Sequence, residues 1–159
     1  MTDPGWVRRP VSDLEMAVLG GWLTADGEMA KGSFSDQLSA AGDANGLAML
    51  LYAAFVIAAR RKFGPQWTRA EVISYVARLR TELQSEEPGL VDPLTAEDEL
   101  RAALGEPVTG THETGFVAAA RLFIMLDIVV DLNLDDEALT DLLNQARHNA
   151  DQMLERIGP

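Results

Sequence analysis

Two stretches of the chain carry apolar residues on every side of a helix. Residues 47–59 contain no charged side chain, and residues 116–130 contain one arginine and one aspartate. A helix that is apolar all round must be covered on all sides by other parts of the protein. We therefore predict an all-α fold, a single-domain bundle of five to six helices, in which the helices over 47–63 and 113–131 are buried centrally.

Helix-starting and helix-ending residues mark further helices in this part of the chain. Gly64 should end the first buried helix, and Thr68 with Glu71 forms a capping box for the next helix. Thr95 should cap a short helix that Gly105 closes. The helix after Thr68 has apolar residues at spacings of four, three and four, which are Val72, Val76, Leu79 and Leu83.

The last predicted helix begins after Asp135 and carries a narrow apolar seam. The residues of this seam alternate spacings of four and three, and they are Leu139, Leu143, Ala146, Ala150, Met153 and Ile157. A narrow seam with small residues at its centre is suited to one close partner helix. We expect this partner to be the helix over 113–131, reached through the short connection at 133–135.

The first 45 residues form a separate predicted segment, a short helix plus a connector, ahead of a helical core domain over 46–159. Ser12 and Glu15 have the spacing of a capping box, so a helix should begin near Asp13. Residues 22–34 leave a second interpretation open, a small hairpin with a turn at Asp26-Gly27.

The net charge of −12 is distributed unevenly along the chain. Residues 1–80 hold nine Lys or Arg and eight Asp or Glu, whereas residues 81–159 hold four Arg and seventeen Asp or Glu. The acidic half repels nucleic acid and anionic membranes, and it would suit a basic protein partner. Cysteine is absent, which rules out disulfides and thiolate metal sites and fits a cytoplasmic location. No apolar run is long enough for a membrane span.

Six of the thirteen basic residues fall within positions 60–80, where two helices joined by a turn have the outline of a helix-turn-helix. Candidate contacts to DNA or to another partner are Arg60, Arg61, Lys62, Trp67, Arg69 and Arg78. Against DNA binding, the helix after Thr68 turns its apolar stripe inward, Arg69 and Arg80 only flank that stripe, and Arg78 points away from it. We expect the flanking arginines to lie over the core and to pair with the acidic half.

Asp127 and Asp131 lie one turn apart in an otherwise apolar helix. A carboxylate in such surroundings needs a cationic partner, so we predict a structural ion pair between Asp127 and an arginine of the first half, with Arg60, Arg61 or Arg80 available. No set of Glu and His residues at metal-ligand spacing accompanies the two aspartates, and we expect no metal and no cofactor. The two histidines, His112 and His148, are expected to be exposed bystanders.

No sequence motif names a reaction, a nucleophile or a phosphate-binding loop. We therefore expect no catalytic residues, and the function that fits best is a non-enzymatic interaction or regulatory module that binds a protein partner, possibly a basic one, through helix surfaces. A homodimer is expected, because two all-round apolar helices have thin cover in a chain of this length. Two alternatives stay open: a helix-turn-helix DNA-binding protein using residues 60–80, and an enzyme or small-ligand binder with a pocket between the central helices.

Overall fold

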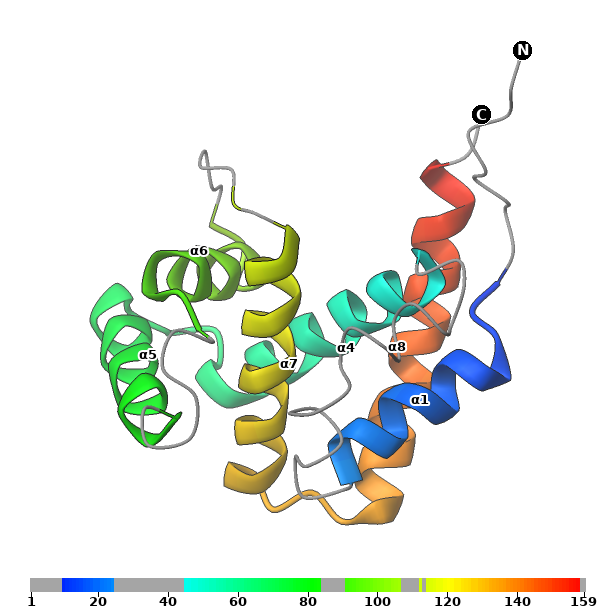
Figure 1. The fold of residues 1–159 in the computed structure, drawn as a ribbon, viewed down its shortest axis with the longest axis horizontal. Helices are drawn as coiled ribbons and strands as arrows, with labels where there is room; N and C mark the ends of the chain where they lie inside the picture. The colour runs from blue at the N-terminus through cyan, green and yellow to red at the C-terminus, as the bar shows by residue number, and fades with distance from the viewer. Residues whose placement is uncertain (1–9, 25–44, 84–90, 107–111, 113, 158–159) are drawn as a thin grey trace. The chain divides into compact units, whose positions relative to one another are not determined.

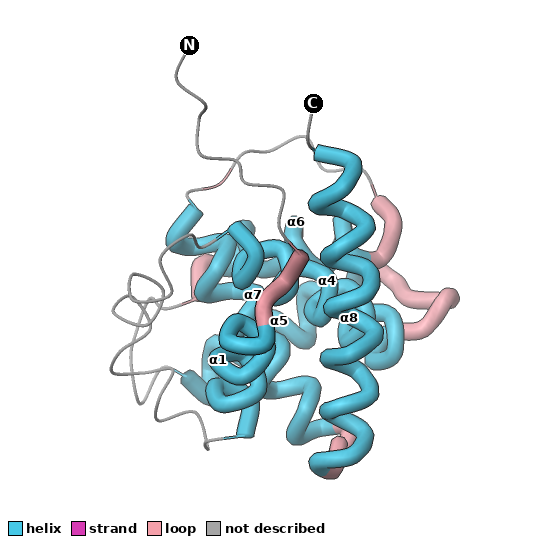
Figure 2. The backbone as a smooth tube through the Cα atoms, turned by 90° about the vertical axis from the view of Figure 1, so that its right-hand side faces the viewer, coloured by secondary structure: helices cyan, strands magenta, loops and turns pink. Residues whose placement is uncertain are grey.

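The computed structural model describes residues 10–24, 45–83, 91–106, 112 and 114–157, and all regular structure within them is helical. The helices are α1 (Asp13–Thr24), α4 (Asn45–Phe63), α5 (Arg69–Leu83), α6 (Pro93–Ala103), α7 (Thr114–Asp131) and α8 (Asp136–Ile157). Figure 2 draws no strand in these ranges. The predicted all-α bundle of five to six helices is confirmed.

The two helices that were predicted to be central are deeply buried. In α4 the side chains of Leu50, Phe55 and Ala58 have no solvent exposure, and in α7 the same is true of Ile124 and Ile128. Their burial follows from apolar residues on all sides, since each side must be removed from water. No helix among the described residues has the length and apolar character that a bilayer span requires.

The chain divides into two compact units, one formed by residues 1–54 with 136–159 and the other by residues 55–135. In the first unit α1 packs against α8, and Figure 2 shows α8 as one continuous helix. In the second unit α6 packs against both α5 and α7 (Figure 1). The boundary of α4 at Asn45 lies next to the predicted segment boundary, and the predicted division into two segments stays a prediction.

In the first unit the α8 seam packs on α1, where Leu143 of the seam lies beside Gly20. The predicted pairing of the seam with residues 113–131 stays a prediction. Leu139, Leu143, Ala146 and Ala150 of the seam are buried. Arg147 joins the two helices through its guanidinium, which donates to the carboxylate of Asp13 at 2.8 Å and to the carbonyl of Val11 at 2.8 Å. These contacts hold the first turn of α1 against the middle of α8.

The capping box at the start of α1 is confirmed. The Glu15 carboxylate accepts from the backbone N–H and the hydroxyl of Ser12, and the Glu15 N–H donates to that hydroxyl at 3.1 Å. The helix continues through Thr24, so residues 22–24 are not a strand, because the helical hydrogen bonding of α1 includes them. The remainder of the alternative hairpin lies outside the described residues.

Glu15 is itself buried, and its carboxylate lies against Gly46 in the first turn of α4. A Cβ atom at Gly46 would overlap this carboxylate. The N-terminal turn of a helix carries partial positive charge and unpaired N–H groups, so it favours a nearby carboxylate. Gly46 therefore allows Glu15 to approach the start of α4 closely.

Most predicted helix ends are confirmed, and one start is corrected. Gly64 and Gly105 have positive φ angles of 71° and 100°, the left-handed conformation with which helices commonly end. Thr95 does not cap α6. The cap is Asp92, whose carboxylate accepts from the N–H of Thr95 at 3.0 Å, and Pro93 begins the helix. Proline is well placed there because its missing N–H has no helical partner at that position.

Candidate functional site

The basic segment spans the end of α4, the turn after it and α5. Thr68 starts α5, since its hydroxyl accepts from the N–H of Glu71 at 3.2 Å. Three apolar positions predicted for the inner face of α5, Val72, Val76 and Leu79, are buried. The inner face of α5 therefore packs within the second unit, as its apolar spacing predicted. The basic residues of positions 60–80 lie beside this face or at the end of α4.

Two cations in the last turn of α4 contact the C-terminal ends of two other helices. Arg60 donates from Nε to the carbonyl of Ala103, the last residue of α6, at 3.0 Å. Lys62 forms an ion pair with Asp131, the last residue of α7. The C-terminal end of a helix carries partial negative charge and unpaired carbonyls, so both contacts are favourable. Arg60 and Lys62 therefore brace the second unit internally.

Asp127 pairs with an arginine of the first half, as predicted, but the partner is Arg78. The Arg78 guanidinium lies 3.3 Å from Asp127 Oδ2, and the Tyr75 hydroxyl donates to the same oxygen at 2.7 Å. Arg78 lies off the buried stripe of α5, as predicted, and its side chain is 44% exposed. Its long side chain bends back over the Tyr75 ring, with the guanidinium carbon 5.2 Å from the ring centroid.

Tyr75 is the centre of this cluster and serves as a hydrogen-bond donor. Phe63 packs edge-to-face against its ring with centroids 5.3 Å apart, and the Lys62 ammonium lies 5.8 Å from its centroid. The pKa of Tyr75 is raised far above its usual value, mainly because the hydroxyl is buried and secondly because it donates a hydrogen bond to Asp127. A phenol of this kind stays protonated near neutral pH and does not act as a base.

The other candidates of the basic segment have different surroundings. Arg80 was expected to be an ion-pair partner, but it donates from Nε to the carbonyl of Val91 at 3.1 Å, just ahead of α6. Arg69 pairs with Glu106 at 3.1 Å. Trp67 is half-buried in the turn, and Arg61 is exposed. Five of the six cations of the segment, Arg60, Lys62, Arg69, Arg78 and Arg80, thus contact an acceptor within the second unit.

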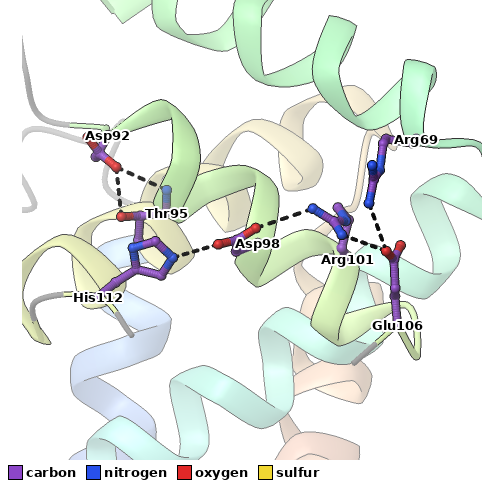
Figure 3. A network of polar contacts seen from close by, with 7 residues as sticks. All are labelled: Arg69, Asp92, Thr95, Asp98, Arg101, Glu106 and His112. Carbon is purple, nitrogen blue, oxygen red and sulfur yellow. Dashed lines mark hydrogen bonds and ion pairs between the residues drawn. The ribbon is translucent and has the colours of Figure 1, made fainter. Parts of the chain in front are cut away.

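A second polar network follows α6 (Figure 3). At the start of the helix, Asp92 accepts from both the N–H and the hydroxyl of Thr95, and these two bonds hold the pKa of Asp92 below its usual value. At the end of the helix, Arg101 pairs with Glu106 at 2.5 Å, and this hydrogen bond is the main cause of a lowered pKa for Glu106. Each carboxylate thus has a structural partner.

His112 is a member of this network, which corrects the expectation of an exposed bystander. Its Nε2 lies 2.7 Å from Asp98 Oδ2, and Asp98 also pairs with Arg101 at 3.3 Å. This pair could not be predicted from the sequence, because the two residues lie fourteen positions apart, one in a helix and the other in the segment ahead of the next helix. His148 is exposed on α8, with its Nε2 at 3.2 Å from the Gln152 amide nitrogen.

These networks have the chemistry of structural ion pairs and helix caps. Among the described residues, no group of three or more His, Asp or Glu side chains could hold a metal ion. Arg101 Nε is buried without a hydrogen-bond partner in the described part of the chain, whereas Asp127 and Asp131, the predicted ion-pair candidates, each have a cationic partner.

The more distinctive surface feature is apolar. Large hydrophobic side chains are exposed on three helices of the second unit, with exposed fractions of 44% for Ile73, 65% for Leu94, 42% for Phe116 and 78% for Val130. Over the described part of α8, by contrast, no large hydrophobic side chain is exposed. Two of the exposed side chains, Phe116 and Val130, belong to the segment 116–130 that is apolar on every side of its helix.

Comparisons with known proteins give no relative. No model of a known protein family matches the chain, and neither a curated protein nor a solved structure is significantly similar to it.

Proposed function

We propose that this protein is a non-enzymatic interaction module that binds a protein partner through the helix surfaces of its second unit. The observation that carries the proposal is the exposure of four large hydrophobic side chains on α5, α6 and α7. Exposed apolar groups are stabilised when a partner removes them from water, and a few buried side chains supply most of the binding energy at a protein interface. A cytoplasmic location for this module is part of the proposal.

Partner chemistry follows from charge. With a net charge of −12, the protein attracts a basic partner at long range and repels an acidic one. Asp136, Glu137 and Asp141 are exposed in the first two turns of α8. These carboxylates add to the attraction of the first unit for a basic partner. Charge of this kind increases the rate of association, and the apolar side chains supply affinity after contact.

DNA binding by residues 60–80 is the weaker candidate. A DNA-binding surface needs several cations free to contact phosphates. Arg60, Lys62, Arg69 and Arg78 each already contact an acceptor in the same unit. Binding DNA would break these contacts or compete with them, and the acidic half would oppose it.

Site-specific photo-cross-linking in the native cells tests the proposal. A photoreactive phenylalanine analogue is placed in turn at Ile73, Leu94, Phe116 and Val130, and at the exposed polar positions Thr140 and Gln152 of α8 as controls. We expect adducts with a polypeptide at one or more of the apolar positions and none at the controls. Absence of adducts at all four apolar positions would contradict the proposal.

A further inference from the structure

We draw no further inference here: the strongest candidate, the exposed apolar surface around Val130 at the C-terminal end of α7, carries no proposal of its own because nothing in the structure shows what covers it.

Discussion

Gly46 shows how a single missing side chain permits a close contact. A Cβ atom added at this position would overlap the buried carboxylate of Glu15. Gly46→Ala should therefore lower the free energy of unfolding by about 1–3 kcal/mol, the usual cost of overpacking. Urea denaturation measures this change.

The matched control is Gly21→Ala in α1, where an added Cβ meets no atom within 4 Å. This variant should raise the free energy of unfolding by about 0.5–1 kcal/mol, because alanine is better than glycine inside a helix. Equal effects of the two variants would show that Glu15 does not lie against Gly46.

Tyr75 gives a prediction about alkaline pH. Its pKa is raised in the folded state, by burial and then by the hydrogen bond to Asp127, while an unfolded tyrosine ionises near about 10. Above that pH the unfolded chain loses a proton that the folded chain keeps, so the stability contributed by Tyr75 falls as pH rises.

The wild type should therefore lose stability between roughly pH 10 and 11, where an unfolded tyrosine ionises. Tyr75→Phe should show a smaller loss over this range, because it lacks the ionising hydroxyl. At neutral pH the same variant should be less stable by about 1–2 kcal/mol, because Asp127 loses a hydrogen-bond donor. Chemical denaturation at each pH measures both effects. A variant with the same pH slope as the wild type would place the Tyr75 hydroxyl in water.

At the scale of elements, the start of α6 depends on one cap. Asp92→Ala should lower the free energy of unfolding by about 0.5–2 kcal/mol. Asp92→Ser still offers an acceptor oxygen, so it should keep most of the stability that the cap contributes. Because the pKa of Asp92 is lowered in the folded state, its charged form adds stability above about pH 4 that is lost on further acidification. Denaturant titrations at neutral and acidic pH measure the free energy of unfolding of both proteins. The difference between wild type and Asp92→Ser should become smaller at low pH.

Burial of α4 leads to a large expected effect for truncating one of its side chains. Leu51 is 4% exposed, so Leu51→Ala should cost about 2–5 kcal/mol through the cavity that it leaves. Leu94→Ala removes the same atoms from a side chain that is 65% exposed and should change stability by less than about 0.5 kcal/mol. Similar losses for the two variants in urea denaturation would mean that α4 is not buried.

For the whole molecule, charge and ion pairing together predict the response to DNA. The net charge is −12, and most cations of residues 60–80 contact acceptors within the second unit. We expect no sequence-selective binding to duplex DNA at physiological salt in fluorescence anisotropy, and only weak non-specific binding at low salt. A nanomolar affinity for one sequence would instead favour a helix-turn-helix function.

The sequence by itself determined which segments are helical, where most of them begin and end, and which two are buried. These features depend on interactions between near neighbours in the chain. Ser12 with Glu15, Thr68 with Glu71 and the glycines at 64 and 105 act within one helical turn. Burial of α4 and α7 follows from their apolar periodicity alone. A cap at Thr95 was predicted wrongly because two acceptors, Asp92 and Thr95, lie within one turn of each other.

Only the tertiary structure decided the partners of the charged residues and of the α8 seam. Arg78 rather than Arg60 pairs with Asp127, and His112 meets Asp98, because packing brings together segments that are distant in the sequence. Long side chains of arginine and lysine reach several acceptors from one backbone position, so helix-face geometry cannot select among them. In the same way, the spacing of the α8 seam specifies one narrow partner but not its identity, and the packing of the folded chain places α1 there.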